Sequence, residues 1–184
     1  MAIGLGRTLA RRSVAPHNPP LGNTGGGNPI MEQAAQAAPG DARFGYFFED
    51  LTIGMSAEYG RIINEEEMRL FADLTGDTNP LHFDDDFAEQ SRFGGRIVHG
   101  MCTAALISTV IGTRMPGPGC IYLSQSLRFT APVRPGDEVV ARAVVDRLIP
   151  ERRRVEFETT CSVGEQTVLS GRALAQVPSR EGPA

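Results

Sequence analysis

The sequence contains no lysine, so all 18 of its basic residues are arginine. Because there are 22 acidic residues, the formal net charge is −4, and the chain lacks the positive field that attracts nucleic acid. Its three cysteines, Cys102, Cys120 and Cys161, are odd in number and too widely spaced for a disulfide framework or a zinc site. This cysteine usage favours a reducing compartment, and we expect a cytoplasmic location.

Long hydrophobic runs are also missing. The longest mostly apolar stretch covers residues 101–111 and is interrupted by Thr103, Ser108 and Thr109. A membrane-spanning helix needs about 20 apolar residues, so this stretch is too short to cross a bilayer. We expect no membrane association and interpret the stretch as a buried core helix.

Residues 1–42 are rich in glycine, proline, asparagine and alanine and contain few large apolar side chains. Such a composition predicts a disordered N-terminal tail. Two alternatives stay open: a targeting segment, because three arginines precede the first acidic residue, or a true start at Met31. We therefore expect one ordered domain over residues 43–178 and a disordered C-terminus over residues 179–184.

Helices are predicted in the first part of this domain. Asn64 is a suitable N-cap, three glutamates follow it in the first turn, and Gly76 is a suitable C-terminal glycine. A short helix is predicted over residues 84–90. Next comes a helix over residues 101–114 that is apolar nearly all round, so we expect it to be buried with a sheet wrapped about it.

The remaining chain alternates apolar and polar side chains, which is the period-two pattern of strands. The predicted strands cover residues 121–131, 138–149, 154–163 and 167–177, with turns at 134–137 and 164–166. Helices followed by a run of hairpin strands indicate an α+β fold with an antiparallel sheet.

Asp77 and His82 lie five residues apart in a loop that follows the predicted helix end, and Pro80 stiffens the link between them. A carboxylate and an imidazole aimed at one point can hold a water, remove one of its protons and return another. The spacing alone leaves a second interpretation open, in which Asp77 caps a turn and His82 is a surface or core histidine. His17 falls in the predicted tail and is not a candidate.

Gly100 follows His99 at the start of the apolar helix, where its backbone N–H is open to a ligand and the helix N-terminus favours a developing oxyanion. A glycine required for tight packing is the alternative. Ser108 either points to the same end of a pocket or lies in the core. The acidic run over residues 84–86 is better interpreted as a solvated helix N-terminus than as a metal site, and we expect no metal.

The segment over residues 71–84, FADLTGDTNPLHFD, resembles the hydratase motif of the MaoC-like dehydratases, and within them the (R)-specific enoyl-CoA hydratases. RIVHGM over residues 96–101 resembles the next block of that family. The two later blocks are GCIYLSQSLRF over residues 119–129 and PVRPGDEV over residues 132–139. Because several blocks occur in order at the family's spacing, the resemblance is specific, and it runs from about residue 46 to residue 177.

The resemblance implies a hot-dog fold, in which an antiparallel sheet wraps a long central helix, and a homodimer that binds acyl-CoA at or near the subunit interface. By the family's motif, Asp77 and His82 are the catalytic pair. The Gly100 N–H binds the thioester oxygen, and Ser108 supports the aspartate. The implied reaction is reversible hydration of a trans-2-enoyl-CoA without a metal or redox cofactor. The alternatives are a hot-dog acyl-CoA thioesterase and a non-catalytic acyl-CoA-binding module.

Overall fold

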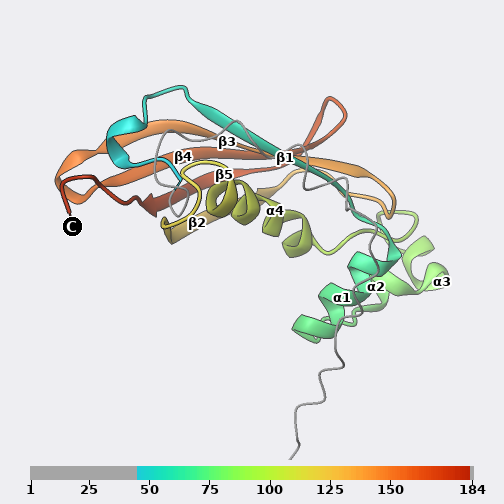
Figure 1. The fold of residues 1–184 in the computed structure, drawn as a ribbon. Coiled ribbons are helices and arrows are strands. Elements are labelled where there is room, and N and C mark those ends of the chain that lie inside the picture. Colours follow the sequence, from blue (N-terminus) through green and yellow to red (C-terminus); the bar gives the residue numbers. More distant parts are fainter. Residues whose placement is uncertain (1–44, 183–184) are drawn as a thin grey trace, which may run out of the picture. The chain divides into compact units, whose positions relative to one another are not determined.

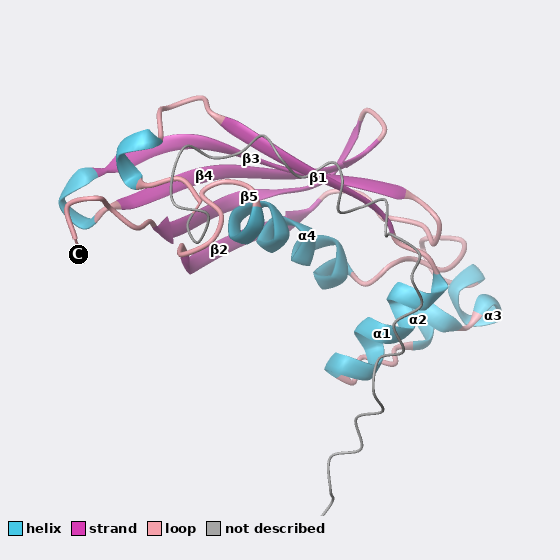
Figure 2. Cartoon of the chain, viewed as in Figure 1, coloured by secondary structure: helices cyan, strands magenta, loops and turns pink. Residues whose placement is uncertain are grey.

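A computed structural model describes residues 45–182, so the predicted tail over residues 1–42 lies outside the described residues. In chain order, the elements are η2 (Phe48–Asp50), β1 (Ser56–Ile62), α1 (Glu65–Thr75), α2 (Pro80–Phe83), α3 (Asp85–Glu89), α4 (Gly100–Thr113), β2 (Ile121–Phe129), β3 (Glu138–Ile149), η3 (Pro150–Arg152), β4 (Arg154–Val163) and β5 (Gln166–Gln176). Figures 1 and 2 show these elements by position in the sequence and by type. Within residues 45–182, no helix is long and apolar enough to cross a membrane.

The five strands form one antiparallel sheet in the order β1-β3-β4-β5-β2. Strands β3 and β4 have the predicted bounds, and β5 begins one residue earlier than predicted. Strand β1 is not predicted from the sequence pattern. Its inward positions are only half-buried and it contains Gly60, so its apolar alternation is weak. The α+β prediction with an antiparallel sheet is confirmed.

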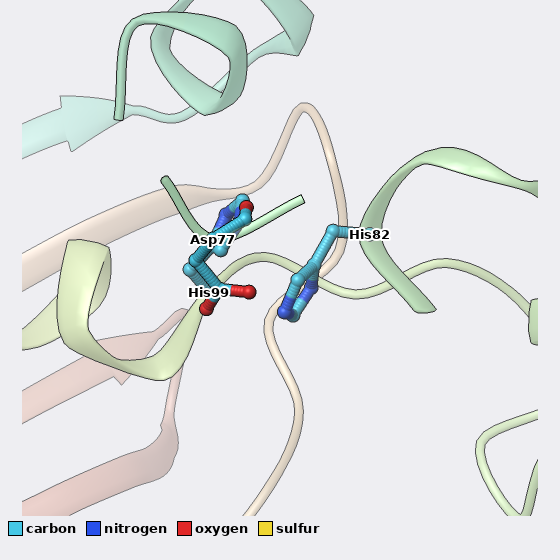
Figure 3. A group of neighbouring side chains, drawn as sticks. All are labelled: Asp77, His82 and His99. Carbon is cyan, nitrogen blue, oxygen red and sulfur yellow. The ribbon is translucent and has the colours of Figure 1, made fainter. Parts of the chain in front are cut away.

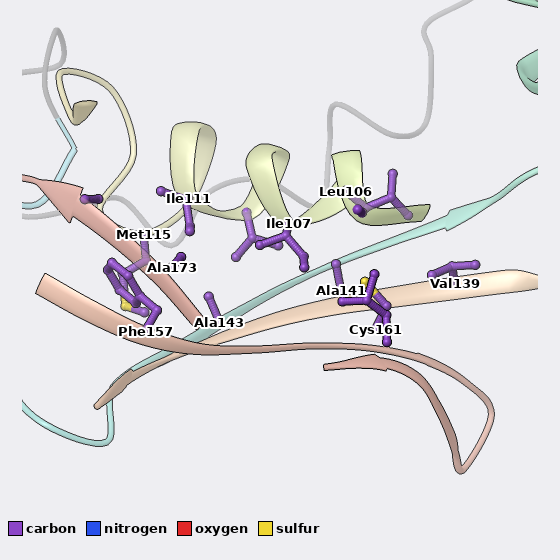
Figure 4. Close-up of a cluster of buried hydrophobic side chains, with 14 of the residues drawn as sticks. Leu106, Ile107, Ile111, Met115, Val139, Ala141, Ala143, Phe157, Cys161 and Ala173 are labelled. Atoms are coloured by element: carbon purple, nitrogen blue, oxygen red, sulfur yellow. The ribbon is translucent and has the colours of Figure 1, made fainter. Parts of the chain in front are cut away.

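Helix α4 lies across one face of the sheet and supplies one side of the core (Figure 4). Its buried side chains include Ile107 and Ile111, which are 1% and 0% exposed. Opposite them, the sheet presents alanines at 141, 143, 173 and 175, all 2% exposed or less. Small side chains at these positions let the helix approach the sheet closely, as dense core packing requires.

One face of α4 is exposed within a single chain, so the sheet does not bury this helix as fully as its apolar sequence predicted. Met101 is 57% exposed, and Ala105, Ser108 and Gly112 are also exposed. Their spacing of four, three and four residues places them on a single face of the helix. We call these four residues the α4 stripe. The sheet of one chain covers only the opposite side of the helix.

Strand β2 is an edge strand with exposed apolar side chains. Ile121 is 58% exposed and Phe129 50% exposed. The pairing of β2 with β5 shifts register between Tyr122 and Ser124, so the simple alternation predicted for this segment is interrupted. An exposed apolar edge is available for pairing with another chain.

Helices α1, α2 and α3 lie together near the end of α4 that carries Gly100 (Figure 1). As predicted, Asn64 caps α1 in a capping box with Glu67, and Gly76 ends the helix with φ 79°. The single predicted helix over residues 84–90 is in fact preceded by a separate turn of helix, α2, because Pro80 follows the N-capping Asn79.

Described residues also extend beyond the predicted domain end at residue 178. The Ser179 hydroxyl donates a hydrogen bond to Glu49, and Arg180 forms an ion pair with Asp50 at 2.8 Å. These contacts connect the end of β5 to η2. The described structure therefore continues past residue 178.

Candidate active site

The loop between α1 and α2 holds Asp77 through local backbone hydrogen bonds. After Gly76, the Asp77 N–H donates to Thr75 Oγ1 at 3.3 Å, and the Asn79 N–H donates to Asp77 Oδ1 at 3.3 Å. Asn79 then caps α2 by accepting from the Leu81 N–H at 3.0 Å. The loop is thereby fixed as a sequence of short turns, and the exposed Asp77 carboxylate keeps Oδ2 for other partners.

His82, on α2, is 7% exposed and has one defined tautomer. Its Nδ1 lies 2.8 Å from the backbone oxygen of Ile97. A carbonyl oxygen only accepts, so Nδ1 carries the proton and donates it. In the neutral ring, Nε2 is then an unprotonated acceptor, which is the form that can take a proton from a bound water.

His99 completes the group, at the N-cap of α4 (Figure 3). It is 1% exposed, and its Nε2 lies 3.0 Å from the backbone oxygen of Asp77, to which it donates. The rings of His82 and His99 stack with centroids 3.8 Å apart and planes inclined by 31°. Asp77, His82 and His99 therefore form one contact cluster, with a ligand atom of each within 4.8 Å of the others.

Aromatic rings surround His99 and exclude water from it. The Phe71 ring lies 5.0 Å from the His99 ring, and the Phe83 ring lies 5.5 Å from it, centroid to centroid. Burial lowers the pKa of His99. The hydrogen bond from its Nε2 to Asp77 opposes that effect, and repulsion from His82 reinforces it. Burial and the neighbouring His82 therefore favour the neutral form of His99.

Gly100 is the first residue of α4, directly after His99. The N–H groups of Cys102 and Thr103 both donate to the His99 carbonyl, whereas the Gly100 N–H precedes the first turn of hydrogen bonds. Gly100 lines a pocket of about 400 Å³ together with Ile97, Thr103 and Phe129. The rest of the lining is mainly apolar, apart from Arg92 and Thr130.

The loop that precedes α4 is held by Arg134, in the turn between β2 and β3. Its guanidinium donates to the backbone oxygens of Gly95 at 2.8 Å and Arg96 at 3.0 Å, and also to that of Phe93. Val98 N–H donates to the Val133 oxygen at 2.8 Å. We call the hydrogen bonds from the Arg134 guanidinium to these three backbone oxygens the Arg134 clamp. The clamp fixes the segment that leads into Ile97 and His99, and both of these residues contact His82.

Ser108 is not part of this cluster within a single chain. It lies eight residues beyond Gly100, or roughly 12 Å along the helix at about 1.5 Å per residue, and it is exposed in the α4 stripe. The structure thus brings together Asp77 and His82 and places Gly100 beside them, but it leaves Ser108 on an open face.

The cluster of Asp77, His82 and His99 is poorly suited to a metal ion. Zn²⁺ requires imidazole nitrogens that point at the ion from about 2.0–2.1 Å. One nitrogen of each ring already lies against a backbone carbonyl oxygen, so only His82 Nε2 and the buried His99 Nδ1 are left as imidazole ligands for an ion. A water molecule or a substrate oxygen fits this donor set better.

Comparison with known proteins gives the family of this fold and site. Residues 51–167 match the family model described as a MaoC like domain. The chain belongs to the MaoC-like family. It is 50% identical over 135 residues to a 3-hydroxybutyryl-CoA dehydratase of Methylorubrum extorquens, an alignment that covers 73% of this chain and 86% of the relative. It is 49% identical to an (R)-specific enoyl-CoA hydratase of Rhodospirillum rubrum, with 73% and 94% covered.

Among solved structures, the (R)-hydratase PhaJ1 from Pseudomonas aeruginosa superposes with a TM-score of 0.69 at 39% identity, covering 74% of this chain and 88% of that one. The hot-dog fold expected from the resemblance is confirmed. The sequence pattern predicts Asp77, His82, Gly100 and Ser108 as site residues but indicates no role for His99 beyond its place before Gly100. The signal available for His99 was its place in the block over residues 96–101, within a MaoC-like motif.

Proposed function

We propose that this MaoC-like protein is an (R)-specific enoyl-CoA hydratase, a hydro-lyase that reversibly adds water to a trans-2-enoyl-CoA to give an (R)-3-hydroxyacyl-CoA. The single observation that carries the proposal is the approach of the Asp77 carboxylate and the His82 ring to within 4.8 Å of each other, beside the start of α4. The hydrogen bond from His82 Nδ1 to the Ile97 oxygen leaves Nε2 as the acceptor of the neutral ring. The names of the relatives in Methylorubrum extorquens and Rhodospirillum rubrum support the same reaction.

In the proposed reaction, one water donates one hydrogen bond to Asp77 and one to His82 Nε2. The water oxygen forms a bond to C3 as its proton moves to His82 Nε2, because an imidazole is a stronger base than a carboxylate. The electrons of the C2–C3 double bond move toward the thioester oxygen. When the enolate collapses, the proton on His82 is delivered to C2, so the net change is the addition of one water.

Gly100 is proposed to bind the thioester oxygen through its backbone N–H. The N-terminus of α4 places positive potential there, where negative charge develops on the oxygen in the transition state. The mainly apolar pocket beside Gly100 supports a substrate that carries an apolar acyl group.

A homodimer is proposed from the exposed surfaces of α4 and β2. The α4 stripe and the apolar side chains of the β2 edge form the kind of unpaired surface that a second copy can cover. The proposed supporting role of Ser108 requires such a copy, since Ser108 lies on the exposed face of α4, about two helical turns beyond Gly100. We propose that Ser108 of the partner subunit approaches Asp77. A cytoplasmic location is also proposed and is supported by three free cysteines.

The test is hydration of crotonyl-CoA in D₂O by the full chain. The reaction is monitored through the absorbance of the enoyl thioester. Loss of absorbance without release of a thiol is expected, with deuterium at C2 on the same side as the new hydroxyl. An (S)-specific 3-hydroxyacyl-CoA dehydrogenase added to the assay should produce no NADH. Rapid NADH production would contradict the (R) assignment, release of free thiol would indicate a thioesterase, and binding without either change would indicate a non-catalytic module.

A further inference from the structure

His99 contacts both members of the proposed catalytic pair. Its Nε2–H donates to the backbone oxygen of Asp77 at 3.0 Å, and its ring stacks on that of His82 at 3.8 Å. It is also joined by a peptide bond to Gly100, whose N–H is the proposed oxyanion donor. Asp77 and His82 thus meet at one buried side chain, and the backbone of the same residue leads directly into Gly100.

The other nitrogen of His99 has an unusual environment. Nδ1 is buried, and no group among residues 45–182 forms a hydrogen bond with it. An unpaired buried acceptor costs about 1–3 kcal/mol, so packing alone gives no reason to retain an imidazole here. A phenylalanine would fill the same aromatic surroundings of Phe71 and Phe83 without that cost.

We propose that His99 is a positioning residue for the hydration reaction: it sets the Asp77 loop and the His82 ring at fixed positions relative to the Gly100 N–H. This inference rests on the proposed function. The Nε2–H bond fixes the backbone that carries the Asp77 carboxylate, and the stack fixes the plane of the His82 ring and therefore the direction of its Nε2 lone pair.

The protonation state favoured for His99 is consistent with this role. Burial and the neighbouring His82 lower the pKa of His99, and the Asp77 carboxylate and carbonyl are the opposing groups. The aromatic rings of Phe71 and Phe83, which also lie against His99, are uncharged. A neutral His99 keeps one donor for the Asp77 carbonyl and places no positive charge beside the ring that must accept a proton.

The inference predicts an effect on kcat rather than on KM, because His99 acts on the alignment of reacting groups and lines no part of the pocket. A displacement of about 1 Å in such groups can cost about 10²-fold in rate. His99→Phe keeps an aromatic ring but removes the Nε2 donor. His99→Gln removes the ring but retains an amide that can donate to the Asp77 carbonyl.

The experiment measures kcat and KM for crotonyl-CoA hydration by the full-length wild type and both variants. We expect His99→Phe to lose about 10- to 100-fold in kcat with KM within about threefold of wild type, and His99→Gln to recover part of the loss. Ile107→Val is the matched control. It is buried on the same helix, at 1% exposure, and should lose about 0.5–1.5 kcal/mol of stability with kcat unchanged. A His99→Phe variant with kcat within twofold of wild type would overturn the inference. An increase in KM with an unchanged kcat would overturn it as well.

A second readout does not depend on activity. The chain contains three histidines, so histidine ring resonances can be assigned by substitution, with His17→Gln as a simplified background. We expect His99→Gln to move the His82 ring protons downfield, because a stacked aromatic ring shields them in the wild type. An unmoved His82 resonance would overturn the inference. Failure of the wild type to hydrate crotonyl-CoA would instead reject the proposed function, and the resonance would still report whether the His99 ring stacks on His82.

Discussion

A Cβ atom added to Gly100 would come within 2.9 Å of Cε1 of Phe129, closer than side chains normally approach. The ring of Phe129 therefore lies directly against the start of α4, where both residues line the pocket. Phe129 fixes one wall of the space beside the proposed oxyanion donor, and a glycine is required for that approach.

Gly100→Ala should accordingly lower kcat/KM by displacing the Phe129 ring, although the backbone N–H remains. We expect a loss of about 10-fold or more, and partial recovery in Gly100→Ala/Phe129→Leu, since neighbouring residues couple in a double-mutant cycle. Gly60→Ala is the control, because the added Cβ would meet Glu138 Oε1 at an ordinary 3.5 Å. If kcat/KM of the double variant were no higher than that of Gly100→Ala, the steric explanation would be wrong.

Substitution of the proposed catalytic pair gives the most direct test of the mechanism. Asp77→Asn and His82→Gln should each fold normally and lose about 10²-fold or more in kcat, the usual scale for acid–base groups. The double variant should be little worse than either single variant, because the residues act as a unit on one water. Melting temperature checks folding. Near-normal turnover in either single variant would remove that residue from the mechanism.

Arg134 should contribute to both stability and rate. Arg134→Gln leaves the carbonyls of Phe93, Gly95 and Arg96 without their shared donor, at a cost of about 1–3 kcal/mol in unfolding free energy. We also expect kcat to fall, because the same loop carries the Ile97 oxygen that orients His82.

Thermal unfolding and crotonyl-CoA hydration would be measured together, with Arg142→Gln as the control. Arg142 is an exposed arginine that forms a 3.4 Å ion pair with Glu58, and such surface pairs contribute about 0–1 kcal/mol. Equal effects of the two substitutions would contradict a special role for the Arg134 clamp.

The N-terminal segment should be dispensable. Deletion of residues 2–42 is expected to leave the melting temperature and kcat/KM nearly unchanged, because a segment rich in glycine and proline buries little apolar surface. A fall of more than about 5 °C in melting temperature would show that the segment docks on the domain, and the proposed boundary at residue 43 would then be wrong.

Local signals made most of the fold predictable. The cap at Asn64, the glycine at Gly76 and the alternation over β3 and β4 each depend on neighbours in sequence, and all were located correctly. Strand β1 was missed because its pairing with β3 is long-range and its own pattern is weak.

In the candidate site, too, contacts between neighbours in sequence were predictable and long-range contacts were not. Asp77 and His82 are close in sequence and were predicted together, whereas His99 reaches Asp77 across 22 positions. Its contacts depend on how α1 and α2 meet the start of α4, and no periodicity encodes that. The tautomer of His82 likewise depends on a carbonyl 15 residues away.

The α4 stripe carries the last prediction, which tests the homodimer and the role of Ser108 together. Ala105→Arg places a long charged side chain in the middle of the stripe, where we expect a second copy to pack, so it should convert a dimer to a monomer. Size-exclusion chromatography with light scattering would measure the mass. The rate of crotonyl-CoA hydration should fall as the dimer is lost, because Ser108 of the partner subunit would no longer reach Asp77. Glu165→Arg, in the exposed turn between β4 and β5, is the control and should leave mass and rate unchanged. Ser108→Ala should lower kcat without changing the mass. A fully active Ala105→Arg monomer would show that each chain is complete by itself and that Ser108 supports no neighbour's aspartate.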